Sequence, residues 1–587
     1  MFITRESGPQ QCPSEASSEG NPLRDVAPES LMVEVGVFAR ERGLMHILGD
    51  LKKGALLAQD ALAYKRHSIY TRADIDCLKV ELNHKWRQTW PLYYVVVVSS
   101  LAAVAQGMDQ AVINGAQLFY PKQFGIDAST LRGSWLLGVV NSAPYLCCAT
   151  LSCWLTHPLN QWFGPRKTIC VACWLSFVTC IWSALTNSWW GLFIARFFLG
   201  FGIGPNSATV PVYVAECAPA GIRGALVTMW HVWTAFGIGL GNLIDVAFYF
   251  IPDSGGIKGL NWRLMLASAG VPGLIACLQV FFAPESPRWL IGKGRYEDAF
   301  NELCRLRSSR LQAARDLYYI HVLIEAENEI KKGRNYIVKM FAIPRNRNAA
   351  IASWIVMFGQ QFCGINVITY YSSNIFSQSG FSDASALVAT AGFGALNWIF
   401  ALSAVFTIDR FGRRNLLLFT IPCMAACLLM TGFSFWDTLR EGRIGGVVTG
   451  IYLFTICYSL GAGSVPLTYS AEVFPLYIRN IGMSFATAVK WFWNFVLSVT
   501  WPSLFLEFKP QGAFGWYAAW CVVLWFLVLF FVRETKSMTL EELDQVFSVP
   551  NRVHAVYGLR QILYGIKKFI LFQQPTPEVL YQRETGI

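Results

Sequence analysis

Two charged residues stand inside long apolar stretches of this sequence. Asp109 lies deep in the stretch 92–118, and Arg196 lies within 189–217. A charged side chain at the centre of a membrane-spanning helix costs about 2.5–3.5 kcal/mol, so such residues persist where they face the interior of a bundle and find a partner. We therefore expect Asp109 and Arg196 to pair inside the protein.

A second group of polar residues is uncharged. Gln360, Gln361 and Asn366 lie in the apolar stretch 348–376, and each side-chain amide offers one acceptor and two donors. Such groups suit a ligand rich in hydroxyl groups, which both donate and accept hydrogen bonds. Gly364 permits a local break in the helix and a close approach of the backbone to a ligand. The alternative role for amides in a membrane helix is hydrogen bonding between neighbouring helices.

The composition and the apolar stretches indicate that membrane-spanning helices position these residues. Of the 587 residues, 54% are hydrophobic and 14% are charged, against roughly 25% charged in soluble globular proteins. About twenty consecutive apolar residues are enough to cross a membrane as a helix. We find two sets of six such stretches: 92–118, 130–156, 167–187, 189–217, 222–250 and 262–283, then 348–376, 384–408, 414–434, 446–472, 480–506 and 514–533.

The remaining segments are polar, and their charges indicate an orientation. We expect a helical N-terminal segment (1–91), an N-terminal six-helix half (92–283), a charged helical linker (284–347), a C-terminal half (348–533) and a tail (534–587). Within them, 31–87 is amphipathic and predicted to pack on the cytoplasmic face or the membrane surface, and 540–547 forms a short amphipathic helix. Lys and Arg gather in the linker and in alternate connectors, which places both termini and the linker in the cytoplasm.

The two sets of six stretches carry an internal repeat. The pattern Y-x-A-E-x-x-P-x-x-I-R occurs at 213–223 and again at 469–479, and F-G-x-R occurs at 163–166 and 411–414. A third landmark, Glu followed by Ser or Thr, closes each set. All three recur in the same order at a spacing of about 250 residues, which indicates duplication. Six crossings return the chain to its starting side, so the halves are parallel repeats, and a substrate site between them near the membrane midplane is expected.

The motifs at the ends of these stretches are specific to one known family. They are P-E-S-P-R-W-L at 284–290, D-R-F-G-R-R at 409–414, Q-Q-F-C-G-I-N at 360–366 and E-T-K at 534–536. Through them, roughly residues 85–550 resemble the sugar porters of the major facilitator superfamily, and the long N-terminal segment resembles fungal sugar and polyol members. The resemblance implies an all-α membrane protein with twelve transmembrane helices in two parallel six-helix repeats, and a transporter that alternates access between the two sides.

The resemblance also implies roles for individual residues. Proton-coupled sugar porters carry an aspartate and an arginine at the places of Asp109 and Arg196, so Asp109 is the expected proton carrier and Arg196 its partner. Burial favours the protonated carboxyl and the arginine favours the ionised one. A permanent structural ion pair is the alternative. The expected substrate-binding residues are Gln360, Gln361, Asn366, Tyr370, Asn397, His231, Lys490, Trp491 and Asn494.

The sequence departs from sugar porters within this set. His231 and Lys490 stand where these porters usually have glutamine, and Leu467 stands where a tryptophan stacks under the sugar. A buried lysine needs a counter-charge or loses its proton readily. One hypothesis is therefore a ligand that is not a plain hexose, such as a sugar acid or a carboxylated cyclic polyol. The alternatives are that Lys490 points away from the pocket or pairs with an acidic neighbour.

Charged residues at the inner helix ends match the family's salt-bridge latch. They are Glu216, Arg223, Asp409, Arg413, Glu472 and Arg479, together with Arg166. Exposed ion pairs contribute only about 0–1 kcal/mol each, so a latch needs several of them. The first-half copy has His157 and Pro165 where an acid and an arginine are usual, which predicts a weaker latch there or one that responds to pH.

Together these features favour a proton-coupled symporter of a sugar or related hydroxylated molecule in a multi-pass membrane protein, most simply of the plasma membrane. A metabolite exporter and a non-transporting sugar sensor are the alternatives. We find no phosphate-binding loop, zinc spacing or nucleophile motif, so an enzyme or an ATP-driven pump has no support. No metal, organic cofactor or nucleic-acid partner is implied, and the expected partners are the substrate, protons and the lipid bilayer.

Overall fold

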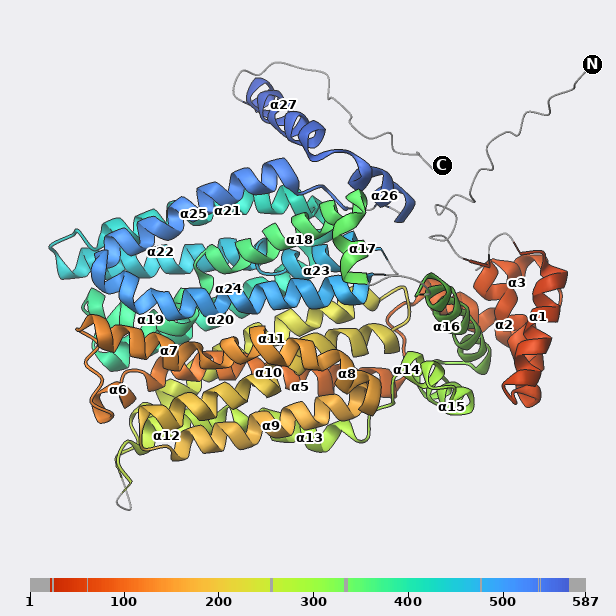
Figure 1. The fold of residues 1–587 in the computed structure, drawn as a ribbon, viewed down its shortest axis with the longest axis horizontal. Helices are drawn as coiled ribbons and strands as arrows, with labels where there is room; N and C mark the ends of the chain where they lie inside the picture. The colour runs from red at the N-terminus through yellow and green to blue at the C-terminus, as the bar shows by residue number, and fades with distance from the viewer. Residues whose placement is uncertain are drawn as a thin grey trace, which may run out of the picture.

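The computed structural model describes residues 22–23, 26–60, 62–253, 257–331, 336–475, 478–536, 538 and 540–569. These residues fold almost entirely into helices, which form an elongated bundle with smaller helices gathered at one end (Figure 1). We call the end with the smaller helices the linker end and the opposite end the far end.

The first half of the bundle contains the six apolar stretches before the linker. Its elements are α5 (Trp90–Ala116), α6 (Tyr120–Gln123), α7 (Leu131–Cys147), the π-helix η3 (Cys148–Ser152), α8 (Cys153–Phe163), α9 (Pro165–Leu185), α10 (Trp189–Cys217), α11 (Arg223–Tyr249), α12 (Leu260–Ser268) and α13 (Gly270–Val280).

The second half repeats this arrangement with some helices interrupted. Its elements are α18 (Pro344–Phe362), α19 (Ile365–Ser379), α20 (Asp383–Phe411), α21 (Arg413–Ser434), α22 (Arg440–Leu460), α23 (Val465–Val473), α24 (Arg479–Glu507) and α25 (Lys509–Phe531). Within the described ranges, ten spans are long and apolar enough to cross a membrane. Helices α10 and α24 are not counted in these ten, but they lie in the same bundle. With them the bundle has two sets of six spans, in agreement with the expected fold.

The two halves lie side by side along the length of the bundle (Figure 1). They meet where α11 contacts α20 and where α7 contacts α24. Gly239 and Gly394 make the first contact close, because a Cβ on Gly394 would lie 2.7 Å from the Gly239 Cα. Small residues of this kind allow membrane helices to approach closely. The interface therefore holds the halves together while leaving room for a cavity elsewhere along it.

The break expected at Gly364 is present. Helix α18 ends just before this glycine and α19 begins just after it, and Gly364 has a φ of +97°. A residue with a side chain rarely adopts this left-handed conformation, whereas glycine does so without strain. The break changes the direction of the chain between the two helices and turns the amides on either side of it toward the same space.

The helices at the linker end belong to the N-terminal segment, the linker and the tail. They are α1 (Pro28–Glu41), the 3-10 helix η2 (Met45–Ile47), α2 (Leu48–Gln59), α3 (Ala63–Arg66), α4 (Arg72–Asn83), α14 (Pro287–Gly292), α15 (Tyr296–Leu306), α16 (Arg310–Lys331), α17 (Tyr336–Ala342), α26 (Leu540–Ser548) and α27 (Asn551–Phe569).

The N-terminal helices pack on the linker. Side chains of α1–α4 share a hydrophobic core with α14–α16, and Arg315 of α16 forms an ion pair with Glu81 of α4 at 2.9 Å. The amphipathic pattern of 31–87 predicted burial of one face, and the linker helices provide the partner. In the tail, α26 corresponds to the predicted helix 540–547. The sequence analysis did not predict α27, which packs on α25.

One buried histidine joins the N-terminal helices to the linker. The ring of His321 on α16 stacks on Phe38 of α1 at 4.4 Å between centroids, and its Nδ1 lies 3.2 Å from the hydroxyl of Tyr296. Burial and the nearby Arg42 guanidinium lower the pKa of His321 to about 4 from its ordinary 6.5, against a smaller opposing effect of Glu41. Glu325 on the same helix lies 3.3 Å from Nε2. His321 is therefore neutral when the helices are docked.

We predict that acidification weakens this docking. A histidine with a lowered pKa in the docked state contributes stability above its ordinary pKa, and this is lost as the pH falls from about 6.5 toward 4. Between about pH 7 and about pH 5 the loss is about 1–2 kcal/mol. Hydrogen exchange of residues 31–57, corrected for the intrinsic rate at each pH, should show reduced protection at the lower pH.

The substitution His321→Gln should remove most of this pH dependence, while His67→Gln, at an exposed position, should leave it intact. Equal protection of residues 31–57 at both pH values in the unsubstituted protein would contradict the prediction.

Candidate functional site

A cavity lies between the two halves in the middle of the bundle. Its empty volume is about 910 Å³, including open solvent at its mouth. Both halves contribute to its wall. The lining residues are Gln106, Gln110, Ser207, Trp230, His231, Thr234, Ala235, Ile238, Met357, Gln360, Gln361, Ile365, Asn366, Thr369, Asn397, Tyr458, Gly463, Leu467, Thr487, Lys490 and Asn494.

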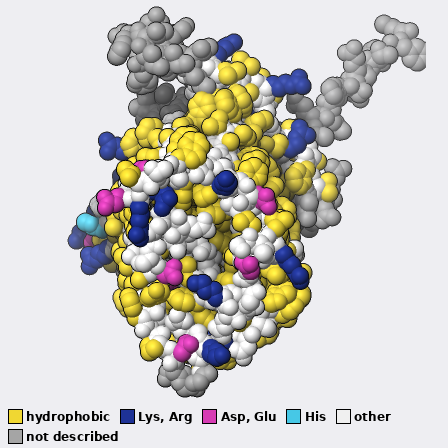
Figure 2. Space-filling model, turned by 90° about the vertical axis from the view of Figure 1, so that its left-hand side faces the viewer, with side chains coloured by type: hydrophobic (Ala, Val, Ile, Leu, Met, Phe, Trp, Pro, Cys, Tyr) yellow, Lys and Arg dark blue, Asp and Glu magenta, His cyan; other side chains and the backbone are white. Residues whose placement is uncertain are grey.

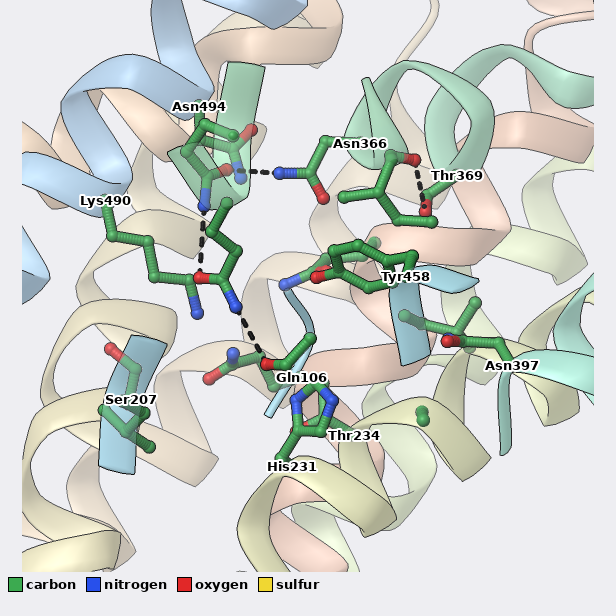
Figure 3. A pocket seen from close by; sticks show the side chains of 18 of the residues that line it. Gln106, Ser207, His231, Thr234, Asn366, Thr369, Asn397, Tyr458, Lys490 and Asn494 are labelled. Atoms are coloured by element: carbon green, nitrogen blue, oxygen red, sulfur yellow. Dashed lines mark hydrogen bonds between the residues drawn. The ribbon is translucent and has the colours of Figure 1, made fainter. Parts of the chain in front are cut away.

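The three amides around the helix break form a connected row on this wall. Asn366 Nδ2 donates to Gln361 Oε1, Gln361 Nε2 donates to Gln360 Oε1 at 3.4 Å, and Gln360 Nε2 donates to the Gly463 carbonyl at 3.0 Å. Figure 3 shows this chain of hydrogen bonds beside the open space. The row fixes the orientation of the amides and leaves donors and acceptors facing the cavity.

Other predicted binding residues surround the same space (Figure 3). Lys490 and Asn494 project from α24, Asn397 projects from α20, and His231 projects from α11 in the other half. Asn397 accepts a hydrogen bond from Ser459 at 2.9 Å. Leu467, the residue in place of the expected tryptophan, also lines the cavity. The wall is thus rich in amides and hydroxyls and carries one amine and one imidazole.

Tyr370 and Trp491 lie behind the cavity wall. Tyr370 accepts a hydrogen bond from Asn494 at 3.0 Å, and Trp491 donates to the Ser207 hydroxyl at 3.2 Å. The ring of Tyr145 stacks on both, at 5.2 Å from Tyr370 and 5.6 Å from Trp491. These two predicted residues therefore support the lining residues in this conformation and do not line the cavity themselves.

Hydrogen bonds between the halves close the far end of the bundle. Asn114 of α5 donates to Ser372 at 2.7 Å and accepts from the Ser373 hydroxyl at 2.6 Å. Gln117 donates to the Tyr370 carbonyl at 2.7 Å. Figure 2 shows the surface of this end, with hydrophobic side chains at its margin and mainly uncharged polar groups and backbone at its centre. The far end is therefore sealed by polar contacts between α5 and α19.

Asp109 and Arg196 are both buried in the first half, at 3% and 2% exposure, but they do not form the expected direct pair. Asp109 Oδ1 accepts a hydrogen bond from the Cys180 thiol at 3.1 Å. Among the described residues, the Arg196 Nε and Nη2 atoms are buried without a hydrogen-bond partner. The carboxyl and the guanidinium are thus near each other in the same half without direct contact in this conformation.

The polar networks at the linker end repeat between the halves. Ser286 donates to Glu216 at 2.5 Å in the first half, and Thr535 donates to Glu472 at 2.6 Å in the second. In the same way the Arg166 backbone N–H donates to Glu285, and the Arg414 backbone N–H donates to Glu534, at 3.2 and 3.1 Å. The repeated motifs therefore build the same structure twice.

The two copies differ where the sequence differs. The Arg413 side chain forms an ion pair with Glu472 at 2.8 Å, whereas the corresponding position in the first half is Pro165, which has no side-chain donor. His157 lies 3.0 Å from Gln161 on the same helix. Arg479 donates to the Phe474 carbonyl at 3.4 Å, and Arg223 begins α11. The Asp409 side chain lies outside the described part of the structure.

Several residues of the site were missed by the sequence analysis. Gln106, Gln110, Thr234 and Tyr458 line the cavity, but isolated uncharged polar residues in apolar helices gave no signal of a shared site. Asp245 on α11 did carry a signal, because it is an acidic residue within an apolar stretch. It is buried, and its Oδ2 accepts from the Gly115 backbone N–H at 3.0 Å, next to the Asn114 that closes the far end.

Comparison with known proteins extends over both halves. The family described as "Sugar (and other) transporter" matches residues 95–547. The chain is 30% identical to Myo-inositol transporter FST1 of Gibberella moniliformis, over 79% of each chain, and 30% identical to Polyol transporter 5 of Arabidopsis thaliana, over 77% of this chain and 85% of that protein. The structure of the proton:xylose symporter XylE, bound to 6-bromo-6-deoxy-D-glucose, matches with a TM-score of 0.66 at 26% identity, over 78% of this chain and 99% of that chain.

We predict that a bulky residue at Gly138 holds the far end open. A Cβ on this residue of α7 would lie 2.4 Å from the Val499 carbonyl oxygen of α24 in the other half. Leucine cannot fit there, so Gly138→Leu should separate the two helices and weaken the contact between Ser134 and Ser503, which lie 3.3 Å apart. Hydrogen exchange of peptides containing Ser134 and Ser373 should increase.

The matched control is Gly515→Leu on α25, where an added Cβ would meet nothing within 4 Å. Its exchange should equal that of the unsubstituted protein. If Gly138→Leu left the protection of the far-end peptides unchanged, the close approach of α7 and α24 would not be what closes this end.

Proposed function

The chain belongs to the sugar transporter family, and from that premise we propose that it carries a sugar or polyol together with a proton across the membrane by alternating access. The proposal rests above all on the central cavity, whose amides and hydroxyls come from both halves of the bundle. Neutral groups that both donate and accept hydrogen bonds suit a ligand with many hydroxyl groups. The myo-inositol, polyol and xylose transporters that the chain resembles are named for such ligands.

The polar contacts of the far end support alternating access. The bonds of Asn114 and Gln117 to α19 join the two halves at that end, and these contacts are small enough to break when the halves rock. In parallel-repeat transporters, rocking of one half against the other exposes a fixed midplane site to each side in turn. We propose that this conformation is closed at the far end and that substrate exchanges through the linker end.

The orientation follows from the basic residues at the linker end. The helix ends there carry Arg166 and Lys167 on α9, Arg410 on α20, and Arg413 and Arg414 on α21. An excess of Lys and Arg marks the cytoplasmic side of a membrane protein. We therefore propose that both termini are cytoplasmic, that the far end faces the outside, and that the protein lies in the plasma membrane as an importer.

We propose that the carboxyl of Asp109 carries the transported proton. This carboxyl is held by one thiol hydrogen bond, and the guanidinium of Arg196 in the same half has buried N–H groups without partners in the described residues. A change in conformation that brings the two together would favour release of the proton, and their separation would favour its uptake. The neighbouring XylE structure is titled a proton:xylose symporter, and proton coupling is proposed for this chain on that likeness.

We predict that Asp109→Asn uncouples transport from the proton gradient. Purified protein in liposomes should take up a labelled ligand from a panel of xylose, glucose, myo-inositol and sorbitol against its gradient when a proton gradient is imposed. Asp109→Asn should reduce this concentrative uptake about tenfold or more while preserving exchange of labelled for unlabelled ligand, because the site itself stays intact.

The control for this substitution is Asp76→Asn, at an exposed position of α4, which should transport normally. Full proton-driven accumulation by Asp109→Asn would exclude Asp109 as the carrier. Equal loss of uptake and exchange would indicate that Asp109 has a structural role instead. Failure of the unsubstituted protein to transport any ligand of the panel or its acidic derivatives would count against the proposed function as a whole.

We also predict that Asn366→Ala weakens ligand binding without altering proton coupling. The amide lines the cavity and connects to Gln361, and loss of one or two hydrogen bonds to a ligand weakens binding about tenfold. Measurement of the concentration for half-maximal exchange tests this. Asn374→Ala on the same helix, outside the lining of the cavity, should leave that concentration unchanged, and an equal effect of both substitutions would contradict the assignment.

A further inference from the structure

The cavity has one basic amine on its wall and, among the described residues that line it, no acidic side chain. Among the described residues that line it, none is Asp, Glu or Arg, and the one lysine is Lys490. We propose that the transported molecule is a polyol that bears a carboxylate and that Lys490 binds this group. The inference rests on the proposed function and adds the chemical class of the substrate.

The surroundings of Lys490 leave its amine available to a ligand. Its Nζ lies 5.1 Å from the centre of the Trp491 ring, and the nearby titratable groups include the thiols of Cys148 and Cys153 and the imidazole of His231. No ion pair or hydrogen bond involves this amine within the described part of the chain. A carboxylate stabilises an ammonium group more strongly than an aromatic face and two thiols do. A ligand carboxylate would supply the missing counter-charge.

Neither alternative for Lys490, a side chain that points away from the pocket or a pair with an acidic neighbour, is seen in this conformation. The amine side chain lines the cavity beside Asn494 (Figure 3). Across the same space, His231 reaches the cavity from the first half, and its Nε2 is buried without a partner in the described residues. The imidazole can donate or accept one further hydrogen bond. A carboxylated ligand would thus contact Lys490 in one half and His231 in the other.

The polar groups of the wall favour a carboxylate over a phosphate. Phosphate sites commonly combine several donors with arginine, whose planar fork contacts two oxygens at once. Here a single lysine is surrounded by neutral amides, which matches one negative charge. The remaining amides, Gln360, Gln361 and Asn366, lie along the wall where they can bind hydroxyl groups. The cavity therefore has one anion-binding position and a longer hydroxyl-binding surface.

A carboxylated substrate changes the charge moved in each cycle. One proton carried with a neutral polyol moves one positive charge across the membrane, whereas one proton carried with a monocarboxylate moves none. The membrane potential should then drive uptake of the neutral molecule and have no effect on uptake of the acid, while the pH gradient drives both. This difference separates the two substrate classes independently of binding affinity.

The first experiment compares binding of acids with that of their neutral parents. Purified full-length protein is titrated calorimetrically with gluconate and sorbitol, with glucuronate and glucose, and with a cyclohexane-polyol carboxylate and myo-inositol. At least one acid should bind about tenfold more tightly than its parent. Lys490→Gln should remove this preference while binding neutral parents at least as well. Lys122→Gln, at an exposed position near the far end, should retain it.

The second experiment measures current and uptake in liposomes with the preferred acid and its parent. We expect uptake of the acid to follow the pH gradient without a substrate-induced current and uptake of the neutral parent, where it occurs, to produce one. Neutral parents that bind as tightly as every acid, or a preference for acids that survives Lys490→Gln, would overturn the inference. Proton-driven uptake of neutral polyols would then still support the proposed function. Absence of transport for all these ligands would contradict both the inference and the proposed function.

Discussion

A polar group inside a membrane is stable only where the protein itself provides a partner or encloses a wet space. The placement of polar residues in this protein follows from that constraint. Asn114 and Ser373 satisfy each other across the interface of the halves, and the amides around Gly364 satisfy one another along the cavity wall. In the described part of the chain, His231 Nε2 at the cavity and Arg196 Nε in the first half are buried without a hydrogen-bond partner. We propose above that these two groups act on the ligand and on the proton.

Duplication explains how the linker end is built, and divergence explains why its halves differ. Glu216 and Glu472 each accept from a hydroxyl, on Ser286 and on Thr535. Glu472 also forms an ion pair with Arg413 of the F-G-x-R motif. In the first half, Pro165 stands at the position of that arginine. The two halves therefore hold the linker end with networks of related design and different composition.

The sequence predicted the fold and much of the cavity because both depend on local patterns. Apolar length predicts the spans, and the repeated motifs predict two parallel halves. Gln360, Asn366 and Lys490 stood out as polar residues in apolar stretches, and the structure places all three on the cavity. Gln106 and Tyr458 could not be assigned in this way, because their shared surface forms only when helices distant in sequence pack together. Asp109 accepts from the Cys180 thiol and does not contact Arg196 directly, because a charge in an apolar stretch predicts that a partner exists but not which side chain provides it.

The small helices at the linker end are divided between the two halves. Arg307 of the linker donates to the Cys217 carbonyl at 2.9 Å, and Thr89 donates to the Leu306 carbonyl at 3.1 Å, so α14–α16 and the N-terminal helices docked on them are attached to the first half. On the other side, Arg345 pairs with Asp544 of α26 at 2.6 Å, which attaches α26 to the second half. If the halves rock as rigid units, these two groups of helices move relative to each other. A change in the docking of α1–α4, such as protonation of His321, would then act on transport through the first half alone.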